Sequence, residues 1–306
     1  MGRILAYAPG DLFPAIPFPA LPAGREDMTT DLWAIFFLPF RMVAAAMPVK
    51  ELTGLIITRN EEKHIASCIR SLQQVCSRIV VLDSGSTDQT REIAASLGAE
   101  VHVRDFDGFG RQKCHGSELC ATEWILNLDA DERVSPEMAA AIAGADLSPH
   151  QGPAAFGFRR RNLFCGRQIR HCGWSPDICY RLYSRSRARW SDSSVHERLE
   201  TRETAVLPGD IVHYAYESLE TFLAKQNRYS TLVAGEMLRH RRQISRCSAA
   251  FHGAHMFVSR YLFRLGFLDG TDGLSICLIQ AVYSYLKYAK YYELLRGSEE
   301  IWDRYQ

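Results

Sequence analysis

Three carboxylates stand within four residues of the sequence, at Asp129, Asp131 and Glu132. They end an apolar segment, with almost no charge to neutralise them, and like charges this close repel unless a proton or cation intervenes. Hard divalent ions prefer carboxylate oxygens, and magnesium commonly takes one or two carboxylates plus substrate phosphates. The pattern therefore predicts that Asp131, helped by Asp129 through a ribose or water, binds Mn²⁺ or Mg²⁺ on a diphosphate. An acidic solvated loop is the alternative.

The elements that position these residues are expected to alternate along the chain. Short apolar runs and helical periods follow one another from residue 52, which predicts parallel strands joined by helices. We expect strands at residues 52–58, 79–83, 99–103 and 124–129. The first expected helix begins at a capping box of Thr58 and Glu61, and the second begins near Thr87 or Asp88 and ends at Leu97. A third follows the strand at 99–103 and runs through Cys120, and a fourth begins at Ser135 with Pro136.

Each of three predicted strands ends in a polar residue, at Thr58, Asp83 and Asp129. In open α/β sheets the ligand lies outside the carboxyl ends of the strands, so these residues are expected at one binding edge. Asp83 is followed by SGSTD, a loop of small and hydroxyl residues that leads into a helix and can approach a ligand closely. A tight turn capped by Asp88 explains the same loop without a ligand.

Three segments in this order carry a family resemblance: ITRNEE at residues 57–62, VVLDSGSTDQT at 80–90 and LNLDADE at 126–132. Together they resemble the donor half of inverting family 2 glycosyltransferases with the GT-A fold. Residues 52–290 are similar to bacterial lipopolysaccharide-core β-1,4-glucosyltransferases. The resemblance implies an α/β fold with a mostly parallel central sheet flanked by helices, and a UDP-sugar as donor.

The resemblance also implies roles for single residues. Thr58 and Asp83 would hold the uracil and ribose, and Asp129 and Asp131 would form the DxD motif. The other donor-binding residues expected in these segments and in the region near the pyrophosphate are Asn60, Glu61, Ser84, Arg111 and Lys113.

Residues 159–189 carry nine arginines against one acid, Asp177. The rigid fork of arginine matches phosphate geometry, so an anionic acceptor is expected here, with a solvated basic surface as the alternative. Nucleic acid is not expected, because no nucleic-acid module is recognisable and the formal net charge is only +1. The predicted acceptor residues are Trp174, as a stacking face or a core residue, with Asp177 and Arg181.

An inverting enzyme needs a base that accepts the proton of the acceptor hydroxyl. The segment SSVHERL at residues 193–199 supplies a carboxylate and an imidazole after the donor half. By resemblance Glu197 is the base and His196 is second, with a surface glutamate beside a structural histidine as the alternative.

The ends of the chain differ in composition from the centre. Residues 1–50 are expected to be a poorly structured extension, and the broken apolar stretch 32–46 is too short to span a bilayer. Residues 51–215 are expected to form the catalytic domain, with a donor half at 51–135 and an acceptor half at 136–215. Residues 216–306 are expected to be helical. Within them, 251–292 predicts two amphipathic helices around the turn 268–273, suited to an anionic membrane surface or to packing on the catalytic domain.

Nine cysteines, an odd number, fit a reducing compartment better than a disulfide framework. We therefore expect a cytoplasmic protein. The resemblance implies an enzyme at the periphery of the inner membrane that transfers a hexose, glucose by the same resemblance, to a lipid-linked saccharide such as the lipopolysaccharide inner core. The alternatives are a polyprenyl-phosphate sugar synthase, a non-catalytic nucleotide-sugar-binding protein and a phosphate-transferring enzyme. The last usually carries its Asp-x-Asp after the first strand, whereas here it follows the fourth.

Overall fold

The computed structural model describes residues 49–192, 197–239 and 248–297. Residues 1–48 of the expected N-terminal extension, and His196, lie outside these ranges. A nine-stranded sheet has the order β3-β2-β1-β4-β8-β6-β11-β5, with β7 paired to β6, within the described residues. The strands of the first half are β1 (Val49–Thr58), β2 (Cys76–Asp83), β3 (Glu100–Val103), β4 (Trp124–Asp129) and β5 (Glu132–Val134). Those of the second half are β6 (Ala155–Phe164), β7 (Arg167–Gln168), β8 (Ile178–Ser184) and β11 (Thr204–Tyr216), and a separate ribbon pairs β9 (Arg189–Trp190) with β10 (Leu199–Glu200).

The first four strands in the sheet order are parallel to one another, as expected. Beyond β4 the sheet is mixed, because β8 runs antiparallel to both of its neighbours and β11 runs parallel to β6. The second-half strands were not predicted. The α/β class is confirmed, while the parallel part is confined to the donor half and one later pair.

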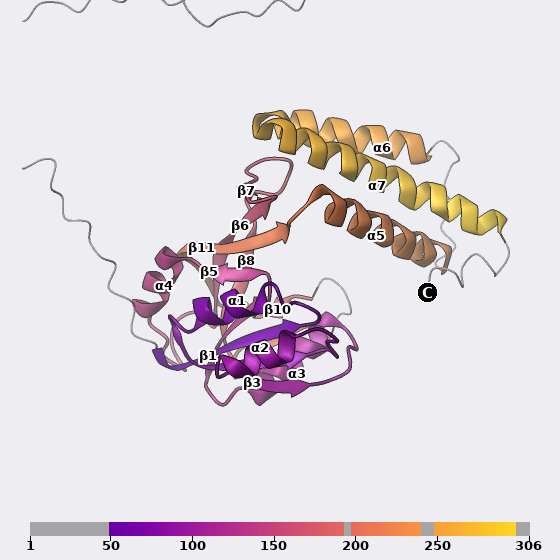
Figure 1. Ribbon diagram of the computed structural model, residues 1–306. Coiled ribbons are helices and arrows are strands. Elements are labelled where there is room, and N and C mark those ends of the chain that lie inside the picture. Colours follow the sequence, from indigo (N-terminus) through magenta and orange to yellow (C-terminus); the bar gives the residue numbers. More distant parts are fainter. Residues whose placement is uncertain (1–48, 193–196, 240–247, 298–306) are drawn as a thin grey trace, which may run out of the picture. The chain divides into compact units, whose positions relative to one another are not determined.

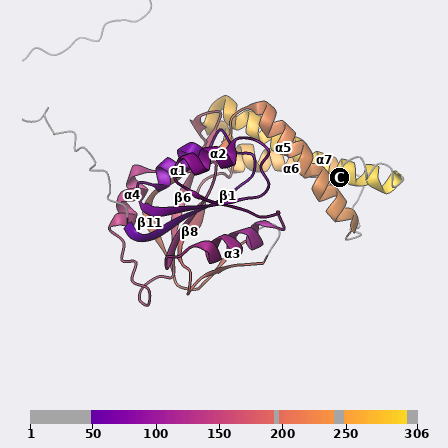
Figure 2. The same ribbon diagram turned by 60° about the horizontal axis from the view of Figure 1, so that its bottom comes forward.

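Helices cover both faces of the parallel strands, α1 (Ile65–Leu72), α2 (Thr90–Ser96) and α4 (Pro136–Ala143) on one and α3 (Phe109–Leu119) on the other (Figure 2). Side chains of a strand alternate between the two faces. Leu52 and Ile56 of β1 therefore pack in the core with α1 and α4, whereas Leu55 packs in the core beside α3. A strand buried on both faces must be apolar throughout, which explains the continuous apolar runs.

The first helix begins later than the capping box predicts. Strand β1 stays paired with β2 as far as Thr58, so that residue is extended rather than helical. A turn follows at Asn60, whose φ is 55°, and α1 begins at Ile65 without a side-chain cap. The predicted box is therefore wrong. Similarly, α2 begins at Thr90, and only the cap at Ser135, which accepts a hydrogen bond from the Met138 backbone N–H, is confirmed.

The C-terminal helices are α5 (Leu219–Arg239), α6 (Ser248–Val258) and α7 (Gly270–Arg296), and α7 packs against both of the others (Figure 1). A π-helical turn (Ser259–Phe263) and a 3-10 turn (Gly266–Asp269) join α6 to α7. The bend thus comes before the predicted turn at 268–273. A Cβ on Gly273 would lie 2.0 Å from the Gly266 carbonyl oxygen, so this glycine allows close packing of the first turn of α7.

Candidate active site

The polar ends of the parallel strands meet at one edge of the sheet. Thr58 is in register with Asp83 across the β1–β2 pair, and Ile57 is in register with Asp129 across the β1–β4 pair. The convergence predicted from the sequence is therefore confirmed.

A cavity of about 480 Å³ opens at this edge. It receives side chains from β1, the loop after β2, the DADE segment, β11 and α5. The expected donor-binding and metal-binding residues in its lining are Thr58, Glu61, Ser84, Asp129 and Asp131. The residues that were not predicted are Phe106, Phe109, His213, Lys225 and Arg228, together with Ile57, Arg59 and Ala130.

Asp83 and Asn60 organise the loops around the cavity. The Asp83 carboxylate is fully buried and accepts hydrogen bonds from the Gly85 N–H, the Ser86 N–H and the Ser86 hydroxyl. Asn60 Oδ1 accepts the Thr87 N–H at 2.8 Å. Both polar side chains therefore hold the SGST loop in shape, and Asp83 presents its carboxylate to that loop instead of to the cavity.

Two basic side chains lie against the acidic cluster, whereas the sequence predicted almost no charge to neutralise it. Arg181, from β8, donates to Asp129 Oδ2 at 2.6 Å and to Glu132 Oε1 at 2.9 Å. Lys113, from α3, lies 3.8 Å from Asp129 Oδ1. Arg181 was expected on the acceptor side, but its buried guanidinium supports the donor-side carboxylates.

These contacts separate the roles of the three acids. Glu132 is fully buried and accepts the Asp129 backbone N–H, so it acts within the fold. Burial alone would raise the pKa of Asp129, but the charges of Arg181 and Lys113 outweigh it and hold that pKa well below the usual range. Of the three carboxylates, Asp131 is therefore the one that is available to bind a cation.

His213 lies beside Asp131, with 3.4 Å between His213 Nε2 and Asp131 Oδ2. Its other nitrogen, Nδ1, is 2.6 Å from Asn162 Oδ1 and donates to that carbonyl. A neutral imidazole donating through Nδ1 has its lone pair on Nε2, which is the state of a metal ligand held by an outer hydrogen bond. Sequence reasoning missed His213, which lies in β11 opposite Glu132 of β5 and shows no motif of its own.

Glu61 faces the same cavity as Asp131. Burial, followed by the negative charge of Asp131, raises the pKa of Glu61 to about 7. Carboxylates whose pKa is perturbed in this way are common at functional sites, so Glu61 belongs with the candidate site residues.

Lys113 also connects the cluster to Glu197, whose Oε1 lies 2.7 Å from Lys113 Nζ. The expected base is thus linked through one buried lysine to Asp129. Arg111, expected beside Lys113, is exposed and pairs with Asp192 at 2.7 Å, outside the lining of the donor cavity.

A second cavity, of about 380 Å³, shares His213 with the first. Two of the three expected acceptor residues, Trp174 and Asp177, line it. Trp174 also packs against Phe164 and Phe222, so it is both a core residue and a cavity wall. Asn162 donates to the Trp174 carbonyl and to Asp177 Oδ2, which continues the hydrogen-bonded chain from His213 into this cavity.

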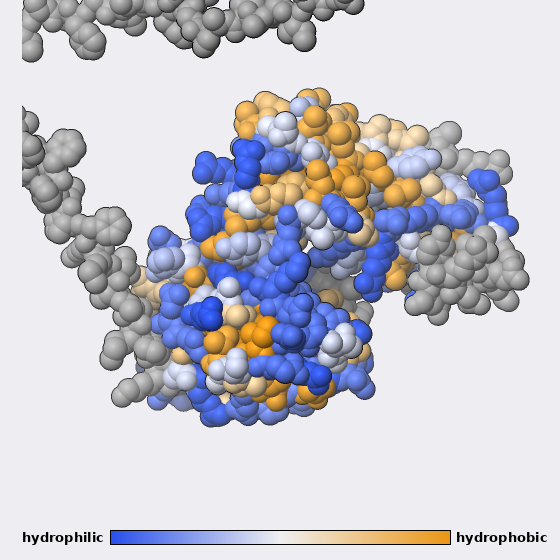
Figure 3. All heavy atoms as spheres, in the orientation of Figure 1, coloured by the Kyte–Doolittle hydropathy of each residue, from blue (hydrophilic) through white to orange (hydrophobic). Residues whose placement is uncertain are grey.

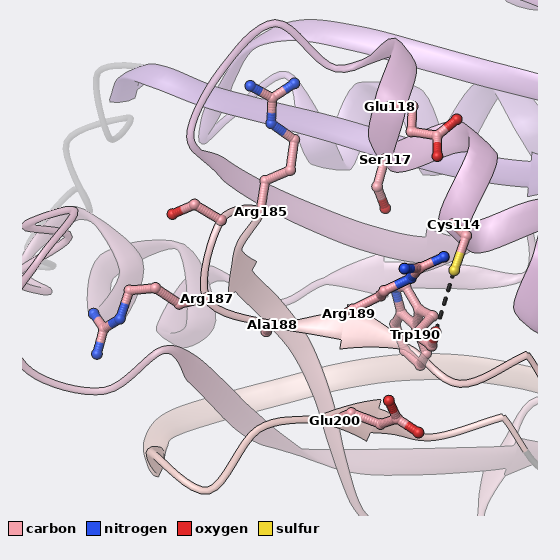
Figure 4. Close-up of a pocket in the computed structure, with 10 residues that line it drawn as sticks. Cys114, Ser117, Glu118, Arg185, Arg187, Ala188, Arg189, Trp190 and Glu200 are labelled. Carbon is pink, nitrogen blue, oxygen red and sulfur yellow. Dashed lines mark hydrogen bonds between the residues drawn. The ribbon is translucent and has the colours of Figure 1, made fainter.

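The nine arginines do not form one positive face. Arg159 pairs with Asp210, and Arg160 pairs with Asp177 and Glu132. Arg185, Arg187 and Arg189 line a third cavity beside α3; in Figure 4, Arg189 lies next to Trp190, whereas Arg185 and Arg187 extend away from it. The fold thus scatters these arginines and pairs some of them with acids from distant segments, so they do not form a single basic surface that would mark the anionic acceptor expected from the sequence.

Comparison with known proteins agrees with the geometry. Residues 55–185 match the family model described as "Glycosyl transferase family 2". An uncharacterized glycosyltransferase of Rickettsia bellii is 30% identical over 257 residues, which cover 80% of this chain and 87% of the relative. The lipopolysaccharide core biosynthesis glycosyltransferase LpsC of Rhizobium meliloti is 29% identical, with 81% and 94% covered.

A solved structure of glucosyl-3-phosphoglycerate synthase from Mycobacterium tuberculosis, in complex with Mn²⁺, uridine diphosphate and glucosyl-3-phosphoglycerate, overlaps 47% of this chain and 60% of that chain, at 20% identity and a TM-score of 0.35. The matched residues include the end of β1 and all of β2 and β4, with the polar residues that end these strands, and the relatives extend across the second half as well. The chain therefore belongs to the family 2 glycosyltransferases.

Proposed function

We propose that this enzyme transfers a hexose, glucose in the simplest case, from a UDP-sugar to a lipid-linked saccharide of the lipopolysaccharide inner core, with inversion. The observation that carries the proposal is a pair of cavities that share His213 in their linings, one lined also by Asp129 and Asp131 and the other by Trp174 and Asp177. A donor and an acceptor placed in these cavities meet beside the carboxylates. The name of the relative LpsC supports the choice of acceptor.

The residues present fit a divalent metal ion whose remaining ligands come from the substrate. No group of three or more His, Cys, Asp or Glu side chains in the described parts of the chain is arranged to hold an ion alone. Asp131 and His213 would supply two ligands, and diphosphate oxygens would supply others, as is common for magnesium. Bound Mn²⁺ or Mg²⁺ would stabilise the charge that develops on the departing diphosphate.

Protein side chains perform the remaining steps of the proposed reaction. Arg181 and Lys113 keep Asp129 ionised, so that its carboxylate accepts hydrogen bonds from the donor. The acceptor hydroxyl attacks the anomeric carbon as the bond to the diphosphate oxygen breaks, and Glu197 accepts the hydroxyl proton. This base must first exchange its contact with Lys113 for the acceptor hydroxyl, and the arriving diphosphate offers the lysine an alternative partner.

The test uses the purified full chain, radiolabelled UDP-glucose and lipopolysaccharide that ends at the inner core. Glu197→Gln keeps the size of the side chain and removes the base, so transfer should fall about 100-fold or more while UDP binding is unchanged. Glu200→Gln is the matched control, since this exposed glutamate lies three residues along on β10. Full transfer by Glu197→Gln would refute the base assignment. No transfer by the wild type from UDP-glucose or other UDP-hexoses would refute the proposed reaction.

A further inference from the structure

The bend between α6 and α7 exposes an unusual run of large apolar side chains. Five of the seven residues from 262 to 268 are of this kind, and Phe263 is 79% exposed. The five residues, called the apolar tip below, are Leu262, Phe263, Leu265, Phe267 and Leu268. Single exposed leucines are common on protein surfaces. A contiguous apolar patch instead marks a surface that contacts a membrane or another molecule.

The apolar surface continues from the tip along α7. Leu274, Leu278, Val282 and Tyr285 follow one another at helical spacing and are all more than a third exposed. Figure 3 shows apolar side chains gathered over the C-terminal helices, and a smaller apolar area within the otherwise hydrophilic surface around the sheet. The patch therefore belongs to the bend and one face of α7.

Hydrogen bonds hold the backbone on both sides of the tip. Asp269 accepts the backbone N–H groups of Arg170 and His171, at 3.2 and 2.8 Å. Arg260 Nη1 donates to the Cys172 carbonyl at 2.6 Å. These hydrogen bonds fix the residues on either side of the tip to the segment after β7. The tip therefore cannot fold back to bury its exposed side chains.

The charge around the tip has one sign. The described segment that leads to the tip, residues 248–268, contains Arg260 and Arg264 and no aspartate or glutamate. The first carboxylates after the bend are paired with basic side chains, since Asp269 contacts His171 and Asp272 pairs with Arg167 at 2.9 Å. A basic segment with exposed apolar side chains is complementary to anionic lipid headgroups above acyl chains.

We propose that the apolar tip inserts shallowly into the surface of an anionic membrane and fixes the enzyme there. A second copy of the chain is a poorer occupant, since a symmetric contact would bring two acid-free, arginine-bearing segments together. None of the helices in the described part of the chain is, taken singly, long and apolar enough to span a bilayer. Residues 248–263 and 266–296 pass that test only as a pair bent by 72°. A bent pair with its apolar residues at the bend fits entry into one leaflet.

Vesicle flotation of the full chain tests the proposal. The wild type should float with vesicles of phosphatidylcholine and phosphatidylglycerol and much less with phosphatidylcholine alone, and salt should weaken binding. Phe263→Ser with Leu268→Ser should lower the affinity at least about tenfold, because two large apolar side chains no longer enter the lipid. The matched control is Val103→Ser with Val206→Ser, which changes residues of similar exposure (58% and 55%) on β3 and β11.

UDP binding by the tip variant should be unchanged, because no residue of the tip lines the donor cavity. Three results would overturn the proposal: no flotation of the wild type, equal flotation of the tip variant, or a dimer that the tip substitutions dissociate without any effect on vesicles. Retention after alkaline carbonate extraction would also contradict shallow insertion and indicate a membrane-embedded hairpin. Vesicle binding needs no sugar transfer, so this inference and the proposed function can fail separately.

Discussion

The buried contacts of Arg181 predict a large and specific loss of stability when that side chain is removed. Only 5% of Arg181 is exposed, and its guanidinium contacts Asp129 at 2.6 Å and the fully buried Glu132 at 2.9 Å. Breaking a buried ion pair from one side costs about 3–5 kcal/mol, because the other charge stays buried. Since Glu132 keeps a weaker contact with Arg160 at 3.5 Å, we expect Arg181→Met to cost about 3 kcal/mol.

The assay is urea unfolding followed by circular dichroism. For a slope near 3 kcal/mol/M, a loss of about 3 kcal/mol lowers the midpoint by about 1 M. The control is Arg159→Met, because Arg159 makes an equally short contact with Asp210 but its side chain is 60% exposed. An exposed pair contributes about 0–1 kcal/mol, so this midpoint should move by less than about 0.3 M.

A second substitution separates charge from packing. Glu132→Gln, added to Arg181→Met, removes the carboxylate that the first change leaves unpaired and should restore part of the loss. Equal midpoints for Arg181→Met and Arg159→Met would refute the reasoning. A double variant less stable than Arg181→Met would show that lost packing, and not the uncompensated charge, governs this site.

Two further predictions concern residues that face Asp131. The pKa of Glu61 is raised to about 7, so its ionisation destabilises the fold increasingly as pH rises from about 4.5 to 7. Glu61→Gln should therefore stabilise the chain by about 1–2 kcal/mol at pH 8, after allowance for solvent screening, and by almost nothing near pH 4, as urea unfolding at both pH values will reveal. Equal effects at both would contradict the shift. His213→Gln should weaken Mn²⁺-dependent UDP binding at least about tenfold in titration calorimetry, whereas His102→Gln, on β3, should not, and an unaltered affinity would remove His213 as a ligand.

The donor half of the fold could be predicted because its strands are buried on both faces. Ile79, Val80 and Val81 are apolar in succession, so β2 is visible without knowledge of its neighbours. The polar residue that ends each strand then marks the binding edge by topology alone. Strand β6 escaped prediction because three consecutive arginines interrupt its apolar residues, and β8 because it is short and one arginine divides it.

The charges of the site could not be paired from the sequence. Arg181 and Glu132 are 49 residues apart, and nothing in the spacing of the arginines indicates which one reaches the acids. The capping box failed for a related reason, since pairing of Thr58 with the neighbouring strand overrides the local preference for a helix start. His213 likewise could not be identified as a site residue from the sequence, because only the strand register places it opposite Glu132.

The most direct test of the donor site is calorimetric binding of UDP with and without Mn²⁺. The wild type should bind UDP more tightly with the ion, and Asp131→Asn should lose that gain while it remains folded. Asp146→Asn, in an exposed loop after α4, should behave as the wild type. UDP binding that is absent under both conditions, or metal-dependent binding that survives in Asp131→Asn, would contradict the account.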